Sequence, residues 1–407
     1  MGRLYWFNAG YEEEIAGAYS MLKPHLGRGR LRGNILLMRK ELALLPLWYA
    51  EDGDLVLTEG KVREVQEFVK DLPDGFPFMA RGVSRAELQK GTEGEFVGMP
   101  WGLSLQSCRL FEELSRECGE GLQIIVPKWN YDYVELAHRR MAGHCLGLLS
   151  ETGRFEGIEA VIPTFLKDED EVERYLSGTL LPQVAKRPFS SSGRGLLRLD
   201  SADVSDKARR WLTGAIHHQG CVGLERWLDK VRDFAMEFYV DAEGKTTYKG
   251  LSVFETDRGA YVGNRLEGQA ELMKHLRDYI SERRLQEISE SVGEALVKLY
   301  EGRYIGYVGV DMLVYREWDR LAIHPCVEIN MRYTMGMAAV ALYERYVHAE
   351  AGTGIFRISY STSAYTEHCT MEKTCLRRWK NGRLLKGYLP LCPVEPETRY
   401  RAYIWLP

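Results

Sequence analysis

The sequence has no CxxC pair, although its 407 residues include eight cysteines. Scattered cysteines without a CxxC pattern are typical of reduced thiols in a cytoplasmic protein, so no disulfide framework is expected. His368, Cys369 and Cys375 are near one another in the chain, but their spacing fits no zinc motif well. We therefore assign neither disulfides nor a structural zinc ion.

Long apolar runs and a strong charge imbalance are also lacking. No stretch approaches the roughly 18 apolar residues of a membrane-spanning helix, and the first residues show no signal-peptide pattern. The formal net charge of −4 gives no general attraction to nucleic acid or anionic membranes. We expect a cytoplasmic protein whose partners include neither, and the sequence leaves open whether it forms a homo-oligomer.

The chain is too long for one ordinary core, so two or three domains are expected. Helical and strand-like patterns alternate along it, which predicts a multidomain α/β (α+β) fold without internal repeats. Helices are expected at 61–72, 103–118, 133–149, 168–178, 201–220 and 283–300. Strands are expected at 34–40, 47–58, 122–127, 182–189 and 222–229, in hairpins at 232–256 and 306–333, and at 356–369 and 376–391.

Apolar and polar side chains alternate at the end of a predicted strand, in the stretch HPCVEINMRY. Because successive side chains on a strand point to opposite faces, Glu328, Asn330 and Arg332 should share one face. Asp311 interrupts an apolar strand, and a short turn would pair the two strands and bring Asp311 beside Glu328. Two carboxylates and an amide oxygen suit Mg²⁺, and an arginine fork suits phosphate. A solvent-exposed strand face would explain the alternation equally well.

A Ser- and Gly-rich turn follows the strand that carries Lys186, in the stretch AKRPFSSSGRGL. Backbone N–H groups of such a turn can bind phosphate oxygens, and Lys186 and Arg194 can add positive charge. A hairpin turn without a ligand explains the same pattern, and the P-loop motif is absent. The stretch GLERWLD, residues 223–229, is by itself an ordinary amphipathic strand.

Taken together and in this order, these motifs resemble the ATP-grasp superfamily over residues of about 128–345, a little over half the chain. The pair VEINMR and GVDMLVY is the specific part of the resemblance. The resemblance implies an ATP-grasp fold with three parts. These are an N-terminal α/β domain at 1–127, an ATP-grasp domain at 128–345 with a lid subdomain at about 145–224, and a C-terminal β-rich extension at 346–407 that completes or flanks the ATP-grasp domain.

The resemblance also implies roles for individual residues. Lys186 would contact the α- and β-phosphates of ATP, and Arg332 would lie beside the transferred phosphate, so these two are the expected catalytic residues. Glu237 would bind the ribose hydroxyls. The implied ligands of two Mg²⁺ ions, or of Mn²⁺ in their place, are Asp311, Glu328 and Asn330. The lid loop and the hinge that would also bind the nucleotide comprise Ser190, Ser191, Ser192, Gly193, Arg194, Gly195, Glu225, Arg226, Trp227 and Leu228.

The chain departs from the family pattern at the lysine that usually precedes the lid. The corresponding segment reads ELAHRRMAG, and Arg139 is expected to replace that lysine, since a guanidinium also binds phosphate. The alternative is that this contact is missing.

Most members of the family join a carboxylate to an amine or another nucleophile after ATP has phosphorylated the carboxylate. The resemblance therefore predicts an ATP-dependent, ADP-forming ligase, with carbon–nitrogen bond formation as the leading case. A small-molecule kinase and a non-catalytic nucleotide-binding module are the alternatives, and the full set of metal ligands argues against the second. The small-molecule or peptide substrates cannot be named from the sequence. Arg258 and Arg265 could hold a substrate carboxylate or could be surface arginines.

Overall fold

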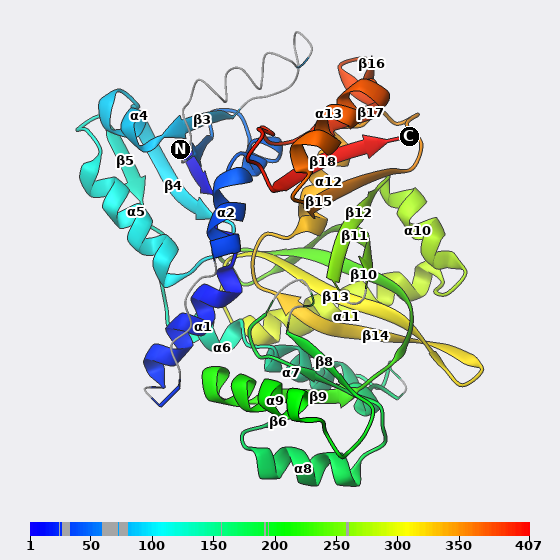
Figure 1. Cartoon of the computed structure of the whole chain (residues 1–407). Helices are drawn as coiled ribbons and strands as arrows, with labels where there is room; N and C mark the ends of the chain where they lie inside the picture. Colours follow the sequence, from blue (N-terminus) through cyan, green and yellow to red (C-terminus); the bar gives the residue numbers. More distant parts are fainter. Residues whose placement is uncertain are drawn as a thin grey trace.

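The structure is a computed structural model that describes residues 1–23, 25–26, 33–58, 72, 80–155, 157–190, 193, 195–257 and 260–407. In this part of the chain the strands form three sheets (Figure 1). The helix expected at 61–72 falls almost entirely outside the described residues. None of the described helices is both long and apolar enough to cross a membrane, and all eight cysteines are free.

The N-terminal part of the chain builds a five-stranded parallel sheet in the order β3-β2-β1-β4-β5. Leu4, Val83 and Phe111 belong to the core between this sheet and its helices. The strands are β1 (Gly2–Trp6), β2 (Leu55–Thr58), β3 (Arg81–Ser84), β4 (Gly94–Pro100) and β5 (Leu122–Ile125). The helices are α1 (Tyr11–Leu22), α2 (Gly33–Glu41), η1 (Leu45–Trp48), α4 (Arg85–Lys90) and α5 (Leu105–Glu117).

The strand expected at 34–40 is wrong, because these residues form α2. Their apolar run is too short for periodicity to distinguish a strand from a helix. Long-range contacts decide the outcome: Arg39 is buried and its Nη2 donates to Glu14 Oε1 at 2.5 Å, while its Nε donates to the carbonyl oxygen of Ala9 at 2.6 Å. The strand expected at 47–58 is correct only at its end, where β2 lies.

A four-stranded antiparallel sheet in the order β6-β9-β7-β8 forms the lower part of the molecule in Figure 1, together with α8 and α9. The helix expected at 133–149 is divided into two, and at the break the Arg139 N–H donates to the Pro188 carbonyl at 3.1 Å. The elements of this part are α6 (Asp132–Leu136), α7 (Arg140–Glu151), η2 (Ile158–Val161), β6 (Thr164–Leu166), α8 (Glu169–Gly178), β7 (Gln183–Lys186), β8 (Leu196–Leu199), α9 (Asp206–Gln219) and β9 (Val222–Arg226).

A nine-stranded sheet in the order β14-β13-β10-β11-β12-β15-β18-β17-β16 forms the centre of the molecule, and its ladders are antiparallel. Its strands are β10 (Asp229–Val240), β11 (Thr246–Asp257), β12 (Ala260–Leu266), β13 (Gly306–Glu317), β14 (Arg320–Asn330), β15 (Gly354–Tyr360), β16 (Arg378–Lys380), β17 (Arg383–Pro390) and β18 (Tyr400–Leu406). The helices between them are α10 (Gln269–Arg277), α11 (Glu282–Tyr300), α12 (Met335–Tyr346) and α13 (Ala364–Thr374).

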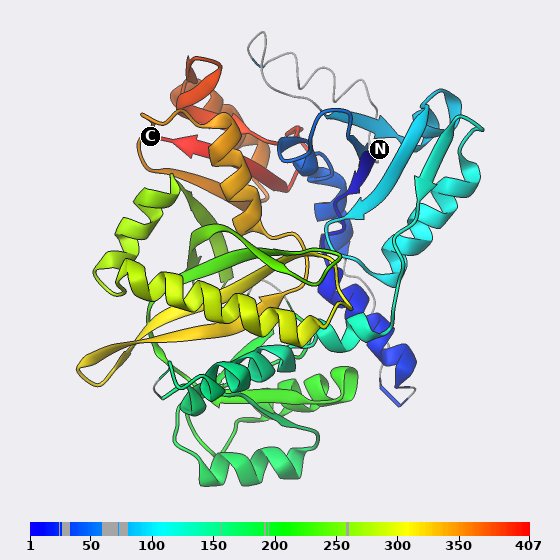
Figure 2. The ribbon, with the colours of Figure 1, turned by 180° about the vertical axis from the view of Figure 1, so that it is seen from behind.

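The two faces of this sheet differ in chemistry. On one face, Phe234, Met236 and Val310 pack into a core with α7, α10 and α11, and the long helix α11 lies across the strands in Figure 2. Side chains alternate along a strand, so the intervening residues, such as Asp311 and Glu237, are directed to the other face. Packing against α7, α10 and α11 therefore fixes the strands β10 and β13, and with them the polar side chains on the other face of the sheet.

The C-terminal segment continues the same sheet, because β15 pairs with β12. The predicted turn at Asn381 and Gly382 is confirmed, with φ of 50° and 72° between β16 and β17. The end of the strand expected at 356–369 is wrong, since α13 begins at Ala364. The mixed α/β (α+β) fold class is confirmed, whereas the domain boundaries at 127 and 345 stay a prediction.

Candidate nucleotide and metal site

A cavity of about 960 Å³ lies between the four-stranded sheet, the polar face of the nine-stranded sheet and residues 7–13, which include the first turn of α1. Most of the site residues expected from the sequence line it: Arg139, Lys186, Ser190, Gly193, Glu225, Arg226, Trp227, Leu228, Glu237, Asp311, Glu328, Asn330 and Arg332. Gly195 lies behind them, where its carbonyl accepts a hydrogen bond from the Arg187 N–H at 2.9 Å. Ser191, Ser192 and Arg194 are outside the described residues.

The expected metal ligands lie at the end of the β13–β14 hairpin. Asp311 is paired directly with Glu328 across the two strands, and Asn330 is paired with Gly309. The register shifts just after this pair, where residues 325–327 of β14 face a single residue of β13. Pro325 fits such an irregularity because it has no N–H to donate to a ladder. The predicted juxtaposition of Asp311 and Glu328 is confirmed.

Carboxyl groups are concentrated at this place in the cavity wall. Burial and the neighbouring carboxylates of Glu328 and Glu237 raise the pKa of Asp311 to about 8. Burial also raises the pKa of Glu237 to about 7, although Thr334 and Ser252 donate hydrogen bonds to its carboxylate. A carboxylate in such surroundings is stabilised by a nearby cation.

This donor set fits a magnesium ion that also binds phosphate. Two carboxylates and one amide oxygen are hard ligands, and Mg²⁺ usually takes one or two protein carboxylates together with phosphate oxygens and water. The described residues contain no group of three or more His, Cys, Asp or Glu side chains arranged to hold a metal by themselves. The remaining ligands would therefore come from a bound nucleotide and water.

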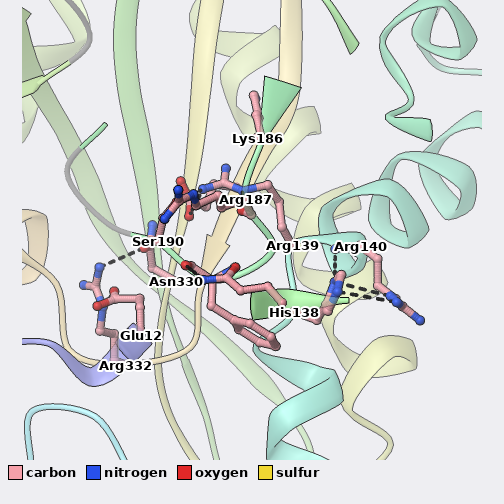
Figure 3. A network of polar contacts seen from close by, with 12 residues as sticks. Glu12, His138, Arg139, Arg140, Lys186, Arg187, Ser190, Asn330 and Arg332 are labelled. Atoms are coloured by element: carbon pink, nitrogen blue, oxygen red, sulfur yellow. Dashed lines mark hydrogen bonds and ion pairs between the residues drawn. The ribbon is translucent and has the colours of Figure 1, made fainter. Parts of the chain in front are cut away.

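Arg332 lies beside these ligands and is held by the N-terminal part of the chain. Its Nε donates to Glu12 Oε1 at 2.6 Å, and its Nη2 donates to Asn330 Oδ1 at 2.9 Å. Burial acts to lower the pKa of Arg332, but the carboxylate of Glu12 raises it above its ordinary value. Figure 3 shows Glu12 next to Arg332, so α1 of the N-terminal sheet contributes to the site.

Glu12 was not predicted from the sequence. Three consecutive glutamates in the first turn of α1 have an ordinary explanation, because acidic side chains stabilise a helix N-terminus. The helix is directed at the site by Gly10, whose φ of 82° is in the left-handed region that favours glycine. The only signal available was therefore a glycine before an acidic first turn, which is too common to indicate a site.

Arg139 is close to the expected metal ligands Asp311, Glu328 and Asn330 (the metal-ligand group), as its proposed role requires. Its Nη2 donates to Glu328 Oε1 at 2.7 Å and to Ser190 Oγ at 3.3 Å, and its Nε donates to the Arg187 carbonyl at 3.1 Å. Figure 3 shows Arg139, Lys186 and Ser190 around one space. A guanidinium at this position can bind phosphate oxygens, and this role of Arg139 stays a prediction.

Lys186 and Glu225 form an ion pair on the four-stranded sheet, and both side chains are buried. Beyond β9, the N–H of Trp227 donates to the Pro182 carbonyl at 3.0 Å. Arg226 is directed to the β13–β14 hairpin, where its Nη2 donates to Glu317 Oε1 at 2.7 Å. The predicted hinge thus joins the four-stranded sheet to the nine-stranded sheet.

The structure places Glu237 beside the metal-ligand group. Its carboxylate lies against the first turn of α12, where a Cβ on Gly336 would be 1.9 Å from Glu237 Oε1. Gly336 and Thr334 line the cavity and were not predicted as site residues. Contact of Glu237 with the ribose stays a prediction.

Changing Glu12 to glutamine tests its effect on Arg332. The amide removes the charge that holds the guanidinium, and we expect turnover to fall about tenfold with little change in the affinity for ATP. Steady-state kinetics and nucleotide titration measure the two quantities separately. The control is Glu271→Gln on α10, whose side chain is about half exposed and does not line the cavity. An equal loss of ATP affinity and turnover in Glu12→Gln would contradict a positioning role.

Comparisons with known proteins found solved structures that are similar to this chain. No protein-family model matches the chain, and no curated protein matches its sequence. The chain is similar to the biotin carboxylase domain of 2-oxoglutarate carboxylase from Hydrogenobacter thermophilus, solved with MgADP, ADP and bicarbonate. The identity is 14%, the match covers 100% of this chain and 86% of that chain, and the TM-score is 0.50.

A second similar structure is biotin carboxylase from Campylobacter jejuni, solved as a β,γ-ATP complex. The identity is 10%, the match covers 100% of this chain and 87% of that chain, and the TM-score is 0.51. At such identities the likeness concerns the fold. The protein therefore shares the fold of these biotin carboxylases, in agreement with the fold that its resemblance to the ATP-grasp superfamily implied.

Proposed function

We propose that the protein is an ATP-dependent, ADP-forming ligase that joins a carboxylate to an amine or another nucleophile through an acyl-phosphate. The observation that carries the proposal is the pairing of Asp311 with Glu328 in the wall of the cavity, with Asn330 and Arg332 beside them. ATP and Mg²⁺ are the proposed cofactors. The solved proteins of similar fold were crystallised with adenine nucleotides, which agrees with this choice.

Different residues would carry out different parts of the proposed reaction. Asp311, Glu328 and Asn330 would hold Mg²⁺, which supplies positive charge to the phosphate oxygens. Lys186 and Arg139 would bind the phosphates from the side of the four-stranded sheet. Magnesium binding requires an ionised Asp311, and the cation itself lowers the pKa of this carboxyl.

The reaction then needs two transfers. A carboxylate oxygen of the substrate attacks the γ-phosphorus and ADP leaves. The amine next attacks the acyl carbon, and inorganic phosphate leaves with one oxygen of the original carboxylate. Arg332 would hold the phosphoryl oxygens in both steps, since a guanidinium can bind two of them and offset developing charge. Glu12 would keep that guanidinium in place.

The fate of the oxygen atoms tests the proposal. Carboxylic acids labelled with heavy oxygen are incubated with the protein, ATP, Mg²⁺ and hydroxylamine as a general nucleophile. We expect ADP, a hydroxamate and inorganic phosphate that contains one labelled oxygen. AMP and pyrophosphate would contradict the proposal in favour of adenylation. ADP with a stable phosphorylated product and no free phosphate would instead identify a kinase. Glu328→Gln serves as the inactive control.

A further inference from the structure

The cavity extends well beyond the proposed nucleotide and metal site, across the same face of the nine-stranded sheet. Asp311 on β13 is paired with Ala235 on β10, and Ala235 is paired with Ser252 on β11. Residues paired in this way share a face. Phe254, two residues further along β11, is paired with Asn264 on β12, and both line the cavity. The wall thus continues from the carboxylates towards the C-terminal strands.

The far end of this wall is apolar and aromatic. β15 is four strands away from β13 in the sheet order, which corresponds to roughly 19 Å at about 4.8 Å per strand. The ring centroids of Tyr360 and Tyr400 are 5.0 Å apart, and Tyr360 is 53% exposed. The lining residues on β15 and β18 are Ile358, Tyr360 and Tyr400, and Ile35, Met38 and Met335 add apolar surface to the same cavity.

The charge of the lining residues also differs between the two ends of the cavity. The end near β13 and β14 carries carboxylates and cations, whereas none of the described lining residues of α2, β12, β15 and β18 is charged. A charged group on the ligand would have no partner there among these residues, and burying it would be costly. The far end therefore selects an uncharged and largely apolar part of a ligand.

We propose that the carboxylate substrate has an extended aliphatic or aromatic tail that binds along this wall, with its carboxylate at Arg332. The proposal rests on the ligase function proposed above. Arg332 lies between the polar and the apolar parts of the cavity. It donates a hydrogen bond to Asn330 on the polar side, and it is followed in the chain by Thr334 and Met335, which also line the cavity. A cation at this junction favours a carboxylate rather than an ammonium as the head group.

Binding of a matched series of acids tests the tail. Acetate, hexanoate, decanoate and decanedioate are titrated by calorimetry into the protein with Mg²⁺ and a non-hydrolysable ATP analogue. We expect affinity to rise about threefold for each methylene that enters the wall. Decanedioate, which differs from decanoate only by its second carboxylate, should bind at least about tenfold more weakly than decanoate.

Two results would contradict the binding of an apolar tail along this wall without affecting the proposed ligase function. These are equal or tighter binding of decanedioate, and nucleotide binding with no preference for decanoate over acetate. Absence of binding by the ATP analogue itself would instead contradict the ligase function.

Substitutions of Tyr360 test where the tail of the substrate binds. Tyr360→Ala should weaken the binding of 8-phenyloctanoate about fivefold and leave acetate and the ATP analogue unchanged, because an aromatic contact is lost. Tyr360→Phe, which keeps the ring, should retain the affinity. The matched control is Tyr365→Ala, since Tyr365 on α13 is 40% exposed and does not line the cavity. Equal binding of 8-phenyloctanoate by Tyr360→Ala and by the unchanged protein would refute this placement.

Discussion

Replacing Asp311 by asparagine should lower ATP-dependent turnover by at least about 100-fold, because a charged ligand of the proposed metal ion is lost. The same change should stabilise the metal-free protein at neutral pH. Asp311 lies among Glu328 and Glu237, and its pKa is raised to about 8. Asparagine keeps the shape of the side chain without the charge. Activity and stability are therefore expected to change in opposite directions.

The pH dependence follows from the direction of this shift. In the unfolded chain the carboxyl ionises near its ordinary pKa of 3.8, whereas in the fold it ionises at about 8. The folded state therefore holds the proton more tightly, and its stability falls as the pH rises from about 4 through about 8. Asp311→Asn removes this pH-dependent loss of stability, because asparagine does not ionise. We expect a gain of roughly 1–2 kcal/mol at pH 8, less than the full shift implies because the site opens to a cavity.

Denaturant unfolding at pH 5 and pH 8, with and without Mg²⁺ and an ATP analogue, measures these changes. The gain of Asp311→Asn over the unchanged protein should appear at pH 8, be smaller at pH 5, and disappear when metal and nucleotide are added. The control is Asp229→Asn at the start of β10, whose side chain is 74% exposed. A destabilised Asp311→Asn protein at pH 8 would show that the hydrogen bond between Asp311 and Asn330 outweighs burial and the repulsion from the neighbouring carboxylates.

The pairing of Asp311 with Glu328 could be predicted from the sequence because its information is local, whereas the role of these residues as metal ligands stays a prediction. Alternation places Glu328 and Asn330 on one face, and a short hairpin brings Asp311 next to Glu328 whatever the rest of the chain does. The alternation is not perfect, because the register shift before Glu328 lets Val327 border the cavity as well. That irregularity was visible only as a proline within a strand pattern.

Glu12 and α2 show what the sequence could not provide. Glu12 reaches Arg332 from a position 320 residues away in the chain, and no local pattern encodes such a contact. Residues 34–40 become helical with Arg39 paired to the buried Glu14, so a tertiary contact accompanies a conformation that a short apolar run leaves undetermined. The helix α13 replaced a predicted strand at a similarly ambiguous stretch.

Substitutions of Lys186 and Glu225 separate their effect on stability from the proposed contact of Lys186 with the phosphates. Its ammonium and the carboxylate of Glu225 are buried as a pair. Lys186→Met leaves the carboxylate without its partner, and we expect a loss of roughly 3 kcal/mol in the free energy of unfolding. The double variant Lys186→Met, Glu225→Gln removes both charges and should recover most of that loss. Neither variant should bind an ATP analogue with Mg²⁺ at more than about a hundredth of the original affinity, because the phosphate contact is absent in both.

Urea unfolding and nucleotide calorimetry on the three proteins measure the two effects independently. The control is Lys274→Met on α10, whose pair with Glu271 is about half exposed and should contribute little to stability. ATP binding that returns together with stability in the double variant would show that Lys186 maintains the four-stranded sheet and does not contact the phosphates. Stability that returns without nucleotide binding would show that an intact fold is not sufficient for binding and that the Lys186–Glu225 pair itself is needed.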